Sequence, residues 1–142
     1  LAGDTADGAL GLEPGAEYHV YDFWNDTYAG MVKGSGTLTQ TLRPGEARML
    51  SVRKVQDHPQ VVSSNRHIMQ GHLDLSDVRW ENNSLHGKIK VAGGDPTRIV
   101  IALNGRKPVA TPGMRIPADG DFAVLALETQ KTETIEWQMV FQ

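Results

Sequence analysis

The chain has no cysteine among its 142 residues. This absence excludes disulfides, thiolate zinc sites and cysteine nucleophiles together. Long apolar runs are also missing, and none approaches the roughly 20 residues that a membrane helix needs. There is no excess of positive charge, since 14 Lys and Arg face 17 Asp and Glu, for a formal net charge of -3. We therefore expect neither a nucleic-acid partner nor a membrane partner.

Aromatic residues are scarce, with three each of Phe, Tyr and Trp, whereas Gly (15) and Pro (7) indicate many turns. The hydrophobic share of 39% lies well above that of disordered chains. The length fits one domain or two very small ones. The start Leu1–Asp4 has neither an initiator Met nor a signal peptide, so we interpret the chain as an excised or processed piece of a longer one. The lack of cysteine is compatible with the cytosol and with a periplasmic or secreted bacterial location, and we expect a periplasmic or secreted one.

The hydrophobic pattern from Glu17 onward has period two, which is typical of strands and not of helices. Tyr18–Trp24 carries aromatic residues at both parities, so we expect both faces of that strand to be covered, one by the domain core and one by a neighbouring domain that this chain lacks. The cleanest alternation is the final one, in which Ile135, Trp137, Met139 and Phe141 share one parity. No segment supports a helix of three turns. Nine or ten short strands separated by turns indicate a sandwich or a barrel, and we predict an all-β, antiparallel β-sandwich of immunoglobulin-like type.

Local features in the first half are also predicted. Residues 9–12 are expected to form a short strand. Leu38 and Leu42 alternate with threonines, which predicts a strand over residues 38–42, followed by a type II turn at Pro44-Gly45. Residues 55–71 interrupt the β pattern, and a single helical turn is expected over residues 66–69.

The second half is predicted to be a series of hairpins. A β-bulge near Ser76-Asp77 would bring four apolar side chains onto one face, those of Leu73, Leu75, Val78 and Trp80. Asn82-Asn83 is typical of a tight turn, and Asn104-Gly105 is a hairpin signal. Phe122–Leu127 is nearly all apolar, which predicts a strand that is central or buried on both sides.

Two domain divisions are compatible with this pattern. In the first, residues 1–16 are a flexible lead-in and residues 17–142 form one β-sandwich. In the alternative, residues 1–57 are the end of one sandwich and residues 72–142 are a separate small β-sandwich. Residues 1–57 alone contain too few strands to bury a core of their own, which favours the first division.

The order of elements between Tyr18 and Lys54 resembles the closing strands of the β-sandwich that follows the catalytic barrel in melibiase-type α-galactosidases and related bacterial glycoside hydrolases. The residues that carry this resemblance are Tyr21, Asp22, Phe23, Trp24, Gly30, Leu38, Pro44, Gly45, Met49, Leu50 and Val52. Residues 63–71 also look like a join found in bacterial members, where another β segment follows. The resemblance covers about residues 9–75. It implies a β-sandwich of glycosidase C-terminal type, and in the alternative division residues 1–57 would be the end of such a glycosidase C-terminal sandwich. It also implies a domain without catalytic residues, because the catalytic aspartates of that family lie on its barrel.

Three aromatic residues are candidates for a functional surface: Trp24, Tyr28 and Trp80, with Asn25 beside the first. Flat exposed rings stack on pyranose faces, and amides bond sugar hydroxyls. The competing interpretation is that these rings anchor the core or a domain interface, which is how most tryptophans are used. We keep both hypotheses, carbohydrate binding and domain interface. Trp137 is expected in the core.

Acidic side chains and histidines give weaker signals. Asp22 and Asp26 are a conceivable glycosidase pair, but nothing makes them converge on one sugar bond, so we interpret Asp22 as bonded to backbone or Arg and Asp26 as a turn former. Of the five histidines, only His67 and His72 have a reason to meet, and two ligands do not make a zinc site. Surface oxygens suited to calcium occur at Asp74, Asp77, Asn82 and Asn83, without the spacing of an EF-hand loop. We predict no cofactor and no metal.

The function expected from these observations is that of a non-catalytic accessory β-sandwich in an α-galactosidase-like glycoside hydrolase. Its partner would be the catalytic barrel of its own parent chain, and the fragment itself would not be an enzyme. Two alternatives remain open: a carbohydrate-binding module with a glycan as partner, and an immunoglobulin-like protein-interaction domain.

Overall fold

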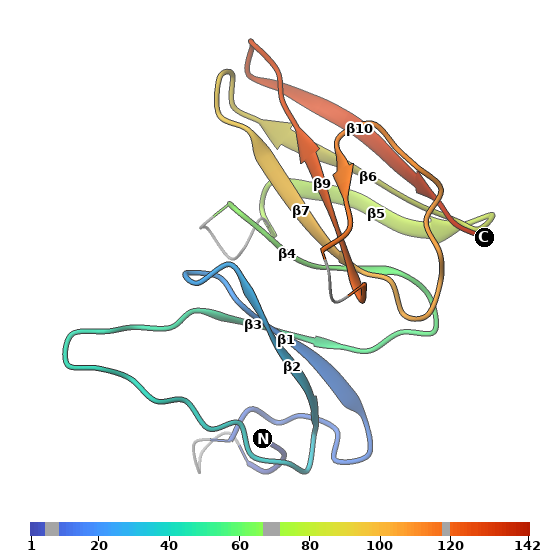
Figure 1. Ribbon diagram of the computed structural model, residues 1–142. Coiled ribbons are helices and arrows are strands. Elements are labelled where there is room, and N and C mark those ends of the chain that lie inside the picture. The colour runs from blue at the N-terminus through green and yellow to red at the C-terminus, as the bar shows by residue number, and fades with distance from the viewer. Residues whose placement is uncertain (5–8, 67–71, 118–119) are drawn as a thin grey trace. The chain divides into compact units, whose positions relative to one another are not determined.

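The computed structural model describes residues 1–142 apart from 5–8, 67–71 and 118–119 (Figure 1). Throughout the described residues the regular structure is β, without a helix, and its three sheets are antiparallel and none closes into a barrel. The ten strands are β1 (Glu17–Asp22), β2 (Thr27–Lys33), β3 (Leu50–Lys54), β4 (Gln60–Ser64), β5 (Leu75–Glu81), β6 (Ser84–Val91), β7 (Thr97–Ala102), β8 (Met114–Arg115), β9 (Phe122–Leu127) and β10 (Glu133–Val140). The prediction of an all-β, sandwich-like chain is confirmed.

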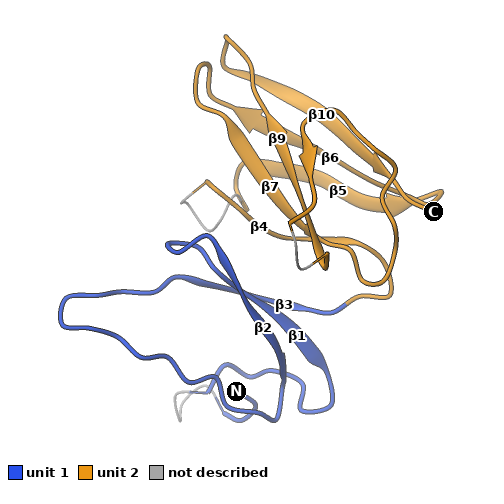
Figure 2. Ribbon diagram, viewed as in Figure 1, with its two compact units in different colours: residues 1–55 blue, residues 56–142 orange. Residues whose placement is uncertain are grey.

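The chain divides into two compact units, which we call the first unit (Leu1–Val55) and the second unit (Gln56–Gln142) (Figure 2). The first unit holds one sheet, in the order β2-β1-β3. Its central strand β1 is buried at every position after Glu17, within this chain itself. The predicted strand ends before Trp24, which lies beyond β1 and is exposed. Aromatic and polar side chains share this burial, with Tyr18 and Val20 of one parity and His19 and Tyr21 of the other.

The second unit has the layers of a sandwich. A four-stranded sheet, β4-β7-β9-β8, and a three-stranded sheet, β10-β6-β5, contribute to one hydrophobic cluster (Figure 1). The buried members of this cluster are Leu85, Ile89, Val91, Ile99, Ile101, Leu103, Ala123, Leu125, Trp137, Met139 and Phe141. β9 lies between β7 and β8, so the prediction of a central strand over Phe122–Leu127 is confirmed. The alternating apolar stripe of the last strand also faces this core.

The predicted bulge is present in β5, where the pairing with β6 shifts between Ser76 and Arg79 and Asp77 adopts a positive φ of 54°. The shift brings Leu75 and Trp80 onto the core side, where both pack against the hydrophobic cluster. The other two side chains do not follow, because Leu73 is 70% exposed and Val78 43% exposed. Leu73 precedes the strand, and Val78 lies within the bulge itself. Regular strand pairing therefore does not direct either side chain toward the core.

Turn predictions in the second unit are confirmed in part. Asn82 and Asn83 have φ values of 48° and 55° and join β5 to β6, as expected for a tight hairpin turn. Asn104-Gly105 also forms a turn, closed by the N–H of Arg106 donating to the carbonyl of Leu103 (3.0 Å). It does not make a hairpin, because β7 pairs with β4 and β9, which lie elsewhere in the chain.

Three local predictions are wrong. Residues 9–12 form no strand, since the backbone amides of Leu10 and Leu12 bond to the carbonyl of Leu1 instead. Residues 38–42 are extended but unpaired. Residues 60–64 form β4, although the region 55–71 was expected to interrupt the β pattern. The helical turn expected over residues 66–69 falls mostly outside the described residues.

The turn at Pro44-Gly45 explains why residues 38–42 do not pair. Gly45 has a φ of 81°, and the N–H of Glu46 donates to the carbonyl of Arg43 (2.9 Å), so the predicted turn is confirmed. A type II turn does not match the right-handed twist of flanking strands, unlike the primed turns of tight hairpins. The two arms separate, and β3 pairs with β1 alone.

Candidate functional site

The connection between β1 and β2 is the candidate site, and we call residues 22–27 the Trp24 turn. The N–H of Asp26 donates to the carbonyl of Phe23 (3.2 Å), which places Trp24 and Asn25 at the tip. Asp26 has a φ of 49°, a conformation that Asp tolerates better than most residues. Two of the predicted site residues therefore lie at the tip of one tight turn.

The Trp24 ring is directed to solvent. It is 60% exposed, and it makes an edge-on contact with the Phe23 ring at 4.8 Å between centroids. The chain's other two tryptophans are half-buried (Trp80) or buried (Trp137). Trp24 is thus the most exposed of the three tryptophans.

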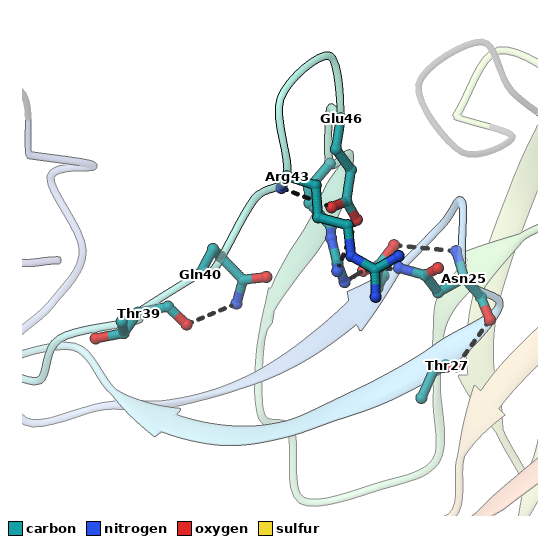
Figure 3. A network of polar contacts seen from close by, with 8 residues as sticks. Asn25, Thr27, Thr39, Gln40, Arg43 and Glu46 are labelled. Carbon is teal, nitrogen blue, oxygen red and sulfur yellow. Dashed lines mark hydrogen bonds and ion pairs between the residues drawn. The ribbon is translucent and has the colours of Figure 1, made fainter.

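The buried carboxylate of Asp22 holds the turn through hydrogen bonds. Asp22 is 3% exposed, and it accepts hydrogen bonds from the backbone N–H (3.1 Å) and the side-chain amide (2.8 Å) of Asn25. Its second oxygen also accepts the Arg48 guanidinium at 2.5 Å. Arg48 in turn bonds Glu46 at 2.9 Å, and Glu46 accepts the backbone N–H of Arg43 at 2.9 Å (Figure 3). The network thus connects the Trp24 turn to the Pro44-Gly45 turn.

The protonation of this network follows from its geometry. Burial by itself would raise the pKa of Asp22, but the hydrogen bonds from Asn25 and Arg48 outweigh it and hold the pKa below its ordinary value. The backbone N–H of Arg43 and the charge of Arg48 lower the pKa of Glu46. The hydrogen bond to Asp22 raises the pKa of Arg48. All three side chains are therefore charged at neutral pH.

Further hydrogen bonds anchor the remaining residues of the turn. The N–H of Phe23 donates to the carbonyl of Met49 (2.9 Å). The Tyr21 hydroxyl donates to the carboxylate of Asp26 (3.0 Å), and the Thr27 hydroxyl donates to the carbonyl of Asn25 (2.7 Å; Figure 3). The interpretation of Asp22 and Asp26 as structural residues is confirmed, because both carboxylates bond within the turn or to Arg48.

Tyr28, the third predicted site residue, lies just beyond the turn in β2. It is half-buried, and its hydroxyl lies 3.3 Å from Nδ1 of His19, with the two rings 6.0 Å apart. Both the ring and the hydroxyl of Tyr28 therefore contact His19 of the neighbouring strand β1.

Trp80 belongs to the second unit, where its ring packs against other side chains. The His58 ring stacks on it in parallel (5.5 Å, 4° between planes), Phe141 packs at an angle (5.5 Å, 59°), and the guanidinium carbon of Arg106 lies 6.0 Å from its centroid. Asn104 fixes the His58 backbone by donating to its carbonyl (2.7 Å). Trp80 therefore anchors an aromatic cluster.

The oxygens considered for calcium have other contacts. Asp74 lies 3.7 Å from Arg66, Asp77 lies 3.2 Å from Lys88, and the two asparagines form the β5–β6 turn. Within the described part of the chain, no three His, Asp or Glu side chains gather as a metal site. The pairing considered for His67 and His72 cannot be placed, since His67 lies outside the described residues.

Sequence reasoning missed Arg48 and Glu46. A signal was present: both flank the predicted Pro44-Gly45 turn, and Arg48 lies two residues before Leu50, which pairs with Asp22. A buried acid on the neighbouring strand needs a cation at about that position.

Comparison with known proteins gave no match to any family model, to any curated protein or to any solved structure. No helix long and apolar enough to cross a membrane occurs in the residues described.

Proposed function

We propose that this chain is a non-catalytic accessory β-domain of a bacterial α-galactosidase-like glycoside hydrolase, of the β-sandwich type that follows the barrel, and that it acts by docking on the catalytic barrel of its parent. The order of residues from Tyr21 to Val52 supports this parentage, together with the strands β1 and β3 and the turn at Pro44-Gly45. Residues 38–42 depart from the pattern, because they form no strand. A periplasmic or secreted location belongs to the same proposal.

The observation that carries the proposal is the exposed Trp24 ring on a turn anchored on both sides. Tryptophan buries 150–250 Å² when it is covered, and it dominates many protein interfaces. A ring held by a rigid turn loses little conformational entropy on binding. An exposed, pre-organised tryptophan is therefore suited to insertion into an apolar pocket on a partner protein.

The acids of the turn support a non-catalytic role. A glycosidase needs two carboxyl groups on either side of the sugar bond, and one of them must have a raised pKa. Asp22 is buried and bonded to Arg48, and its pKa is lowered. The Asp26 carboxylate accepts a hydrogen bond from the Tyr21 hydroxyl. These are the properties of structural carboxylates.

A carbohydrate-binding module is the second candidate, and the exposure of Trp24 beside Asn25 favours it. A sugar site also needs polar groups that converge on the ligand. Here the Asn25 amide donates to Asp22, and Asp26 accepts from Tyr21, so both side chains bond inside the turn. At Trp80 the stacked His58 ring would compete with a sugar for the ring face. Docking on a protein therefore accounts better for the geometry.

The test is a calorimetric titration of this chain against the catalytic barrel that the proposal places before Leu1 in the parent protein. We expect a one-to-one complex that Trp24→Ala weakens by roughly 30-fold or more, the loss typical of a hot-spot residue. Met31→Ala is the control, because Met31 is also exposed (57%) and lies in the same sheet. The proposal is overturned if no barrel is encoded there or if the barrel does not bind. Binding of galactosides or polysaccharides that is lost in Trp24→Ala would establish the carbohydrate module instead.

A further inference from the structure

We propose that Arg48 is the positioning residue of the Trp24 turn: acting through Asp22, it holds the turn in the shape that presents the Trp24 ring. This inference rests on the proposed docking function and adds to it the residue on which the presentation of the ring depends. We call Asp22, Arg48 and Glu46 the Arg48 clasp.

The first step is the geometry of the guanidinium. One terminal nitrogen of Arg48 bonds Asp22 (2.5 Å), and the other bonds Glu46 (2.9 Å). The planar fork of arginine spans two carboxylates at once, which the single ammonium of lysine does not do with the same orientation. The Nε atom of Arg48 is buried and has no hydrogen-bond partner among the described residues, so the two terminal nitrogens make the described hydrogen bonds of this side chain.

The second step is the burial of Asp22. Its side chain is 4% exposed, less than any other side chain in the ion pairs of the described residues. A buried carboxylate that loses its cation is strongly destabilised and moves toward water or takes up a proton. Either response disturbs the acceptor oxygens that hold the backbone and side chain of Asn25, the residue after Trp24.

The third step connects two turns that are distant in sequence. Glu46 bonds Arg48 with one carboxylate oxygen, and with the other it accepts the N–H of Arg43, across the Pro44-Gly45 turn (Figure 3). The segment from residue 34 to residue 49 contains no strand. The clasp therefore holds the end of this segment beside the Trp24 turn through the contact of Arg48 with Asp22. The Pro44-Gly45 turn sets the position of Arg48 through Glu46.

The test uses fluorine NMR of the whole chain labelled with 5-fluorotryptophan. Three signals report Trp24, Trp80 and Trp137 separately, and Trp24→Phe assigns the first. We expect Arg48→Leu to shift and broaden the Trp24 signal, to leave the other two unchanged, and to weaken binding of the barrel at least tenfold. Arg48→Lys should fall between Arg48→Leu and the wild-type chain. Lys54→Leu is the control, because it breaks the exposed ion pair with Glu13 in the same unit.

The outcomes separate this inference from the proposed function. If Trp24→Ala leaves barrel binding unchanged, docking through the Trp24 ring is refuted, while the Trp24 signal still tests the role of Arg48. If Trp24→Ala weakens binding but Arg48→Leu does not, or if Arg48→Leu leaves the Trp24 signal unchanged, the positioning role is refuted. Should Arg48→Leu change all three signals, the chain has unfolded, and Glu46→Gln and Arg48→Lys decide by the same criteria.

Discussion

At the residue scale, the second unit depends on one close contact between neighbouring strands. Gly87 of β6 pairs directly with Trp137 of β10, and a Cβ on Gly87 would lie 2.5 Å from Cζ2 of the indole. The missing side chain makes the space in which a ring that is only 5% exposed can lie. The φ of Gly87 is not in the left-handed region, so the backbone conformation does not require glycine here. Glycine is required because a side chain would collide with the indole.

Gly87→Ala is therefore expected to lower the free energy of unfolding by about 1–3 kcal/mol, the usual cost of overpacking a core. Trp137→Phe in the same chain should recover part of this loss, because the smaller ring vacates the position of Cζ2. Gly15→Ala is the control, since a Cβ there meets nothing within 4 Å. Urea unfolding followed by circular dichroism measures all four proteins. Equal stability of Gly87→Ala and the wild-type chain would show that the strands can separate without cost.

A second prediction at this scale concerns acid. The folded-state pKa of Asp22 lies below its ordinary value of 3.8, so its contribution to stability is fully present above that pH and is lost as the pH falls through the lowered pKa. We expect Asp22→Asn to be less stable than the wild-type chain at neutral pH by on the order of 1 kcal/mol. The difference should shrink below about pH 3.8. Unfolding free energies at several pH values check this, and a difference that stays constant into acid would contradict it.

At the element scale, turn chemistry decides which strands pair. The β5–β6 hairpin is closed by Asn82 and Asn83, which both have positive φ, as a type I′ turn requires. The type II turn at Pro44-Gly45 leaves residues 38–42 unpaired although their sequence alternates as a strand should. The period-two pattern thus marks residues capable of pairing, and the turn determines whether they do.

Replacing Asn83 tests this dependence. Asn83→Gly removes the residual cost of the left-handed conformation and should stabilise the chain by up to about 1 kcal/mol, whereas Asn83→Ala should destabilise it by about 1–2 kcal/mol. Thermal denaturation of the two variants gives the comparison. A stabilising Asn83→Ala would mean that the turn is not formed with positive φ in solution.

At the scale of the whole molecule, apolar burial is divided unequally. The hydrophobic cluster lies in the second unit, between its two sheets. In the described residues of the first unit, the buried hydrophobic side chains are Tyr18, Val20 and Tyr21, beside a single three-stranded sheet. A sheet of this size is marginal without a further layer.

We therefore expect residues 56–142 to fold when expressed alone and residues 1–55 to remain largely unfolded. Dispersed amide signals in nuclear magnetic resonance spectra and a cooperative thermal transition identify a folded fragment. The whole chain serves as the reference for both. A well-dispersed spectrum of residues 1–55 would contradict the expectation, because it would show that three strands bury enough surface unaided.

The all-β class, the core-facing apolar stripe of the final strand, the central position of Phe122–Leu127 and the bulge in β5 could all be predicted from the sequence, because the spacing of apolar side chains along the strands indicates them. The sequence also placed Trp24 and Asn25 together, since they are neighbours in the chain. The pairing of β4 with β7 and the contact of Arg48 with Asp22 became evident only in the folded chain. Those outcomes depend on which segments meet in space and on how much each contact stabilises the fold. The local alternation of apolar and polar side chains carries no information about either.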